Sequence, residues 1–341
     1  MIYVIIGFLW LALLLYLVMG GADFGAGILE LFSSRANRAR NRKIMYHAIG
    51  PIWEANHMWL IIAIVILFVG FPVIYTTVST YLHIPLLIML MGIIARGTAF
   101  AFRNYDAVHD DMQRLYNRIF IYSSFITPLF LGIIAGSTVS GRIDTGAHDF
   151  MSAYVYSWLN WFSVSIGLFT IALCGFLAAI FLIGEAEEDE RRRSFINKAK
   201  AMNIAAVIFG ANVFVAALSE HIPLADWVFG NAVGITAVTA ATISLVILWY
   251  LIGKGKRKII RLLAGFQVTM IFITTTWKHY PNIVTLKNGG YLSLMDGGGS
   301  DKTMLTLGIA LLAGSLFILP ALFYLIYSFQ RGRVLLEDDD H

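Results

Sequence analysis

Glu54 and His57 are the residues whose types and spacing most directly indicate chemistry. They lie within residues 50–60, Gly-Pro-Ile-Trp-Glu-Ala-Asn-His-Met-Trp-Leu, which open an apolar run that continues to Val69. Residues three apart share one face of a helix, so this carboxylate and imidazole could form a hydrogen bond. A carboxylate in a membrane span costs about 2.5–3.5 kcal/mol and usually faces a partner or a water-filled path. The pair therefore predicts a proton relay.

Two other interpretations of the same stretch stay open. Trp53 and Trp59 flank the polar residues, including Asn56, so the group could be a polar cap that two indoles anchor at the membrane interface. His57 could also ligate a metal or a haem, although no partner histidine occurs at a suitable spacing.

Asp23 lies in a glycine-rich segment, residues 20–27, Gly-Gly-Ala-Asp-Phe-Gly-Ala-Gly. Small residues such as Gly25 and Gly27 let another helix or a ligand approach closely. A dinucleotide-binding loop is excluded because no strand precedes the glycines. Asp23 is either a solvated residue at a helix end or a carboxylate that close packing pairs with a basic residue.

Arg96 and Arg103 are seven residues apart, about two helical turns, so both point to one side of a helix. Arg96 falls inside an apolar run, where an arginine needs an anionic partner. Asp23 and Glu54 are the candidate partners. The alternative is that the side chain extends to the membrane surface, which fits Arg103 better than Arg96.

The composition requires a membrane around these residues. The chain has 341 residues, of which 58% are hydrophobic and 13% charged, and its mean hydropathy is +0.74. These values are typical of a polytopic membrane protein. No alternating strand pattern of a membrane barrel occurs, so the fold class is all-α. The single cysteine, Cys174, excludes an intrachain disulfide and a metal cluster built on cysteines.

The hydropathy predicts nine transmembrane helices in one membrane domain. The first run, which has no basic segment before it, is interpreted as a retained span. The arrangement predicted is two four-helix bundles, from about 1–137 and 154–278, plus one peripheral helix. The spans are about 2–19, 51–69, 84–102, 119–136, 161–183, 204–218, 233–252, 262–277 and 304–329.

The basic residues alternate between the two sides of the membrane. Of the 25 lysines and arginines, 20 follow odd-numbered spans and Arg96 lies inside a span. The opposite side holds only Arg142, Lys278, Lys287 and Lys302. Because basic connections stay in the cytoplasm, we expect the N-terminus outside and the C-terminus inside.

Three motifs resemble subunit II of the cytochrome bd-type quinol oxidases. They are Gly-Ala-Asp-Phe-Gly-Ala-Gly, Pro-Ile-Trp-Glu-Ala-Asn-His-Met-Trp-Leu and Arg-Gly-Thr-Ala-Phe-Ala-Phe-Arg, all within the first 103 residues. Their order, their spacing and the nine-span plan agree with that family over essentially the whole chain. The family's acidic and basic motif positions fall on Asp23, Glu54 and Arg96. Some relatives have a further acid where this chain has Asn117.

The resemblance implies a heterodimer in the bacterial cytoplasmic membrane. Subunit I of the family carries the quinol-oxidising loop and all ligands of haem b558, haem b595 and haem d, where oxygen is reduced to water. The resemblance therefore implies that this chain ligates no haem or metal, stabilises subunit I and supplies protons from the cytoplasm. A structural quinone in this chain and a small single-span accessory subunit are left open.

The mechanism expected is proton uptake near Asp23 and Glu54, aided by His57, with Arg96 and Arg103 as charge partners. Trp53, Asn56, Trp59, Gly25 and Gly27 would pack the motif, and electrons would bypass the chain. Two alternatives remain: a secondary transporter with a buried charged relay, and a purely structural partner subunit.

Overall fold

The computed structural model describes residues 1–33, 45, 53–105, 111–186 and 188–338. Side chains at 53, 54, 104, 105, 111, 323 and 325–338 are not described. The predicted roles of the Trp53 and Glu54 side chains therefore lie outside the described residues, as do the five basic residues predicted between 35 and 43.

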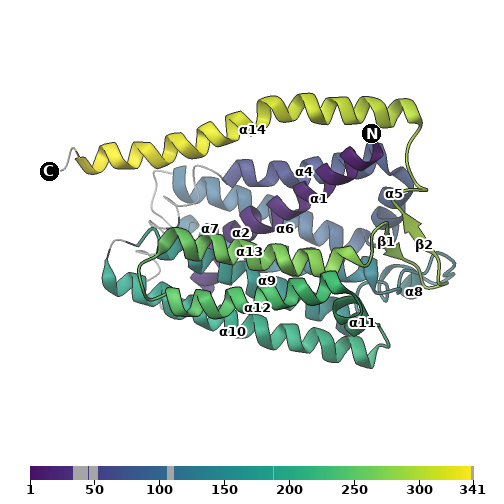
Figure 1. Ribbon diagram of the computed structural model, residues 1–341, viewed down its shortest axis with the longest axis horizontal. Helices are drawn as coiled ribbons and strands as arrows, with labels where there is room; N and C mark the ends of the chain where they lie inside the picture. Colours follow the sequence, from purple (N-terminus) through teal and green to yellow (C-terminus); the bar gives the residue numbers. More distant parts are fainter. Residues whose placement is uncertain (34–44, 46–52, 106–110, 187, 339–341) are drawn as a thin grey trace.

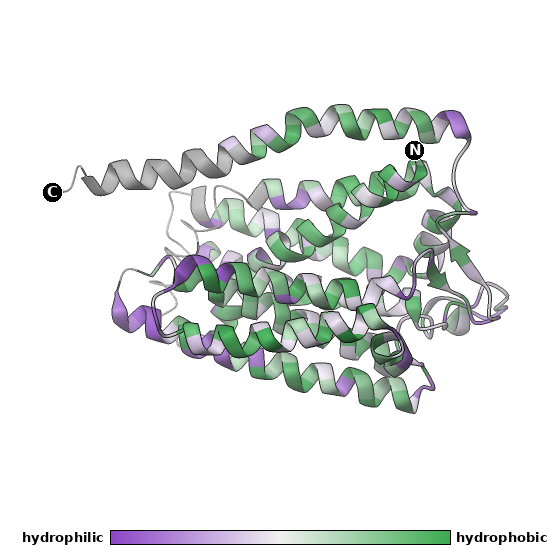
Figure 2. Ribbon diagram, in the orientation of Figure 1, coloured by the Kyte–Doolittle hydropathy of each residue, from purple (hydrophilic) through white to green (hydrophobic). Residues whose placement is uncertain are grey.

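Long helices that lie roughly along one common axis make up most of the molecule (Figure 1). Apolar residues cover their middle portions, and hydrophilic residues gather near their ends (Figure 2). The described residues include eight helices long and apolar enough to cross a membrane, or nine if a bent pair counts as one span. The chain is thus a multi-pass helical membrane protein, as predicted.

The first span is longer than the sequence suggested. It runs without a break through α1 (Ile2–Leu15), the π-helical turn η1 (Tyr16–Gly20) and α2 (Gly21–Leu31). The predicted end at residue 19 is therefore wrong. Two adjacent glycines follow Met19, but the backbone hydrogen bonds continue through the wider π turn instead of ending there. Asp23 consequently lies inside a helix.

The second span bends sharply where a proline follows it. α4 (Trp53–Gly70) and α5 (Pro72–Tyr81) meet at 114°. Proline lacks an N–H group and disfavours helical geometry in the residue before it, and Phe71 has φ −133° and ψ 62°. The Gly299 N–H donates to the Gly70 carbonyl at 2.8 Å, so this helix end keeps a backbone partner.

Helix α9 (Trp161–Ile183) forms the centre of the molecule. It packs against α2, α7 (Asp111–Val139), α10 (Asp189–Ser219) and α13 (Arg257–Trp277). Because α9 contacts helices of both predicted halves, the division into two four-helix bundles stays a prediction. The last helix, α14 (Asp301–Asp338), lies along the edge against α1 and α4 (Figure 1).

The two ends of the bundle differ in structure. One end, called here the hairpin end, holds Met1 and the antiparallel strands β1 (Asn282–Thr285) and β2 (Tyr291–Ser293) (Figure 1). The short helices α8 (Phe150–Tyr154) and α11 (Leu224–Phe229) also lie there. The opposite end is called the basic end. The remaining helices are α6 (His83–Tyr105) and α12 (Ala232–Leu251).

Gly25 lets α2 and α9 touch, and its replacement tests that contact. A Cβ atom on Gly25 would lie 1.9 Å from the Cys174 carbonyl oxygen. We expect Gly25→Ala to destabilise the protein by about 1–3 kcal/mol, because the two backbones must separate. Gly265→Ala is the control, since nothing lies within 4 Å of the place its Cβ would take and alanine favours a helix. Thermal unfolding of purified protein measures both; equal midpoints would contradict the contact.

Candidate functional site

Asp23 and Arg96 form a buried bidentate ion pair between α2 and α6. Arg96 Nη1 donates to Asp23 Oδ2 at 2.8 Å, and Nη2 donates to Oδ1 at 2.7 Å. Nη2 also donates to the Asp23 backbone oxygen at 3.0 Å. Both side chains are 1% exposed. The structure thus makes Asp23 the partner that the sequence suggested for Arg96, and Asp23 is not a solvated residue at a helix end.

The guanidinium of Arg96 is held on every side. Its Nε donates to Ser124 Oγ on α7 at 3.0 Å. The rings of Phe24 and Phe120 lie 5.1 and 4.9 Å from its Cζ, within cation–π range. Gly27 makes room for Ser124, because a Cβ at Gly27 would lie 2.2 Å from the serine oxygen. The motif glycines Gly25 and Gly27 therefore bring α2 against α9 and α7.

A second ion pair repeats the first one about two turns further along both helices. Arg103 Nη1 donates to Glu30 Oε2 at 3.1 Å, and the carboxylate side chain is fully buried. The Phe120 ring lies 3.9 Å from Arg103 Cζ. Extension of Arg103 to the membrane surface is therefore wrong: a buried carboxylate offers the charge that the guanidinium needs.

Glu30 is the residue that the sequence reasoning missed. It follows Asp23 by seven residues, as Arg103 follows Arg96 by seven. Two equal spacings on two helices predict two stacked pairs once the helices are taken to be adjacent. The equal spacing is visible in the sequence, but it predicts a second pair only after Asp23 and Arg96 are known to form the first.

His57 lies beside the first ion pair, on α4. Its ring is 6.0 Å from that of Phe24 and 6.3 Å from that of Tyr16. The Asp23 and Arg96 charges both act on His57 electrostatically. His57 therefore lies within electrostatic range of the Asp23–Arg96 pair, while the Glu54 side chain lies outside the described residues and the relay stays a prediction.

Three buried polar atoms on η1 and α4 lack hydrogen-bond partners within the described part of the chain. They are Tyr16 Oη, Asn56 Oδ1 and Trp59 Nε1. A buried polar atom left unsatisfied costs about 1–3 kcal/mol, so proteins usually supply such atoms with ordered water. These atoms are therefore candidates for hydrogen bonds with ordered water.

The described residues do not form a metal centre. No three His, Cys, Asp or Glu side chains within them come close enough together to hold a metal ion. His57 is flanked by the Tyr16 and Phe24 rings, whose centroids lie 6.3 and 6.0 Å from its own. The absence of haem ligands from this chain stays a prediction.

The family model of cytochrome bd terminal oxidase subunit II matches residues 1–329. The chain belongs to this family. Its fold is also similar to that of a chain in the structure of bd oxidase from Geobacillus thermodenitrificans, with a TM-score of 0.74 and 20% identity. That match covers 96% of this chain and 98% of the other. The three sequence motifs therefore indicated the correct family.

Curated relatives include further members of the subunit II family. Cytochrome bd ubiquinol oxidase subunit 2 of Bacillus subtilis is 29% identical over 62% of this chain and 62% of the relative. Cytochrome bd-I ubiquinol oxidase subunit 2 of Escherichia coli K12 is 25% identical over 50% of this chain and 46% of the relative. The chain thus spans roughly half to two-thirds of these two relatives. A putative cytochrome bd menaquinol oxidase subunit II of B. subtilis is 22% identical over 98% of this chain and 97% of the relative.

Proposed function

We propose that this chain is subunit II of a quinol:oxygen oxidoreductase of an aerobic respiratory chain. The observation that carries the proposal is the family match over residues 1–329. The names of the relatives include ubiquinol and menaquinol oxidases, so a quinol is the reductant class. The partner would be a haem-bearing subunit I, which this chain stabilises in a heterodimer. A secondary transporter is not favoured, because the family is one of terminal oxidases.

The orientation proposed follows from the basic residues. The basic end would face the cytoplasm and the hairpin end the outside of the bacterial inner membrane. In this orientation the Glu30–Arg103 pair lies nearer the cytoplasm, at the ends of α2 and α6. The Asp23–Arg96 pair lies about 10 Å deeper, given the rise of a helix over seven residues.

The two ion pairs act as fixed charges in this proposal. Bidentate contact between a guanidinium and a carboxylate is the geometry of two ionised groups. The Asp23–Arg96 pair and the single contact of Glu30 with Arg103 therefore hold α2 against α6 and place two carboxylates beside the proposed path. The two carboxylates stabilise a cation, such as a proton in transit, only where the paired arginine does not cancel their negative charge.

Glu54 and His57 are the proposed proton carriers. They are three residues apart on α4, and the Tyr16 ring, whose hydroxyl has no hydrogen-bond partner within the described residues, lies 6.3 Å from the His57 ring. Protons would enter from the basic end, pass these residues and reach the oxygen-reducing centre of the partner. Electrons from quinol would not pass through this chain. Uptake on one side and release of quinol protons on the other would make turnover electrogenic.

Purification of the chain with its natural companions tests the proposed function. We expect a second, haem-bearing subunit to elute with it, the reduced complex to show haem b and haem d bands, and oxygen consumption to start on addition of a quinol. A colourless chain that purifies alone and moves a solute after reconstitution would contradict the proposal.

A further inference from the structure

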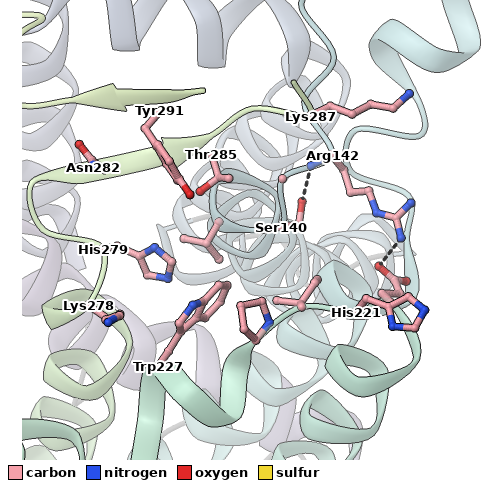
Figure 3. Close-up of a pocket in the computed structure, with 15 residues that line it drawn as sticks. Ser140, Arg142, His221, Trp227, Lys278, His279, Asn282, Thr285, Lys287 and Tyr291 are labelled. Carbon is pink, nitrogen blue, oxygen red and sulfur yellow. Dashed lines mark hydrogen bonds and ion pairs between the residues drawn. The ribbon is translucent and has the colours of Figure 1, made fainter. Parts of the chain in front are cut away.

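A cavity of about 680 Å³ opens at the hairpin end of the bundle (Figure 3). It lies where α7, α10 and α13 end and the β1–β2 hairpin begins. The sequence places only four lysines and arginines on this side of the membrane. Arg142, Lys278 and Lys287 line the cavity, whereas Lys302 does not. Three of the four basic residues predicted on this side of the membrane therefore line one cavity.

Glu220, the acidic residue among those lining this cavity, binds mainly to backbone N–H groups of α9. Glu220 Oε1 accepts the backbone N–H of Trp161 at 2.8 Å and that of Phe162 at 3.3 Å. It thereby caps the start of α9, where free N–H groups attract a carboxylate. Its other oxygen is 3.4 Å from Arg142 Nη2, a long contact between partly exposed side chains. Glu220 thus neutralises Arg142 only in part.

The two lysines keep part of their charge available. Lys287 Nζ lies 2.9 Å from Asp144 Oδ2, and the Lys287 side chain is 59% exposed, so water weakens this pair. Within the described part of the chain, the Lys278 side chain makes no hydrogen bond or ion pair, and only its backbone N–H donates, to the Thr276 carbonyl. When Asp144 is counted with the lining residues, one positive charge remains unbalanced.

Neutral hydrogen-bonding groups complete the lining. His279 packs edge-on against Trp227, with ring centroids 4.4 Å apart. Burial and the neighbouring Lys278 lower the pKa of His279 to about 4, so the ring is neutral at pH 7 and can donate one hydrogen bond. Thr285 and Tyr291 add hydroxyl groups (Figure 3). Cations and neutral donors around one cavity suit an anion with several acceptor oxygens.

The position of the cavity also indicates its ligand. Trp277, the last residue of α13, is 57% exposed, and Tyr280 is 39% exposed. Exposed tryptophan and tyrosine at the ends of membrane helices mark the level of the lipid head groups. Lys278 and His279 lie between these two aromatic residues in the sequence. We therefore expect the cavity to lie at the depth of lipid phosphates.

We propose that the cavity lined by Arg142, Lys278 and Lys287 binds a phosphate-bearing anion. Its depth favours the head group of an anionic phospholipid over free phosphate. The ligand would hold the ends of α7, α10 and α13 against the hairpin. The proposal rests on the cavity and on its position at the ends of the membrane helices, and it is independent of the proton path.

Titration of the delipidated, purified complex tests the proposal. The probes are short-chain phosphatidylglycerol, short-chain phosphatidylcholine and inorganic phosphate, and the readout is the thermal unfolding midpoint. We expect phosphatidylglycerol to raise the midpoint in a saturable way. The double variant Lys278→Gln/Lys287→Gln should need roughly 30-fold more of it, because each lysine contributes to binding an anion at the membrane surface. Lys302→Gln, the matched control outside the cavity, should titrate like the unaltered protein.

Each outcome decides the question. A saturable shift with inorganic phosphate that depends on the same two lysines supports the anion site and identifies a soluble source. A double variant that titrates like Lys302→Gln overturns the proposal, and so does the absence of a shift with every phosphate-bearing probe. All variants exchange exposed lysines, so elution as one symmetric peak checks that they assemble before titration.

Discussion

Arg96→Met is expected to destabilise the protein by about 3–5 kcal/mol, because it leaves the Asp23 carboxylate buried without its counter-charge. Asp23 is 1% exposed and accepts three hydrogen bonds from Arg96, counting its backbone oxygen. Methionine fills much of the volume of arginine, so the loss reports charge more than packing. The measurement is thermal or denaturant unfolding of the purified complex, followed by circular dichroism.

Two further variants make this result specific. Asp23→Leu/Arg96→Met removes both charges, and we expect most of the stability to return, since apolar residues of similar volume can replace a buried ion pair. Arg142→Met breaks the long, partly exposed contact with Glu220 and should cost at most about 1 kcal/mol. Equal losses for Arg96→Met and Arg142→Met would refute the structural role assigned to the buried pair.

Glu54→Ala is expected to slow oxygen consumption by roughly tenfold to a hundredfold while the haem spectrum stays unchanged. Positioned acid–base groups typically contribute at least this much, and Glu54 is a proposed carrier of protons toward the partner. Proton uptake should fall in parallel with oxygen consumption. Both are measured on reconstituted complex with excess quinol, so that the supply of electrons does not limit the rate.

Conservative and distant substitutions separate a relay from a structural role. Glu54→Asp retains a carboxylate and should recover most of the rate. Glu188→Ala removes an exposed acid on the connection before α10 and should leave the rate unchanged. If Glu54→Ala turns over at the normal rate, the relay is wrong. If Glu54→Ala and Glu54→Asp both lose the haem spectrum, Glu54 serves assembly alone.

The structure corrected the sequence reasoning at positions where two helices meet. Arg96 inside an apolar run already required an anion, and Asp23 was one of two candidates. The choice between Asp23 and Glu54 depended on which helix lies beside α6, and hydropathy contains no such information. The same holds for Glu30, whose partner Arg103 is 73 residues away. Likewise, the close approach of α2 to α9 at Gly25 is a contact between segments far apart in the sequence.

The sequence by itself was enough to identify the membrane environment, the all-α fold class and the family of this protein. Apolar runs about 20 residues long require helices in lipid, because backbone groups there must find partners within their own segment. Three motifs with ordered spacing then indicated the family. Only the tertiary structure decided which charges pair, which rings flank His57 and which basic residues of the hairpin end line one cavity. Those features are set by close contacts between distant segments, which local patterns do not encode.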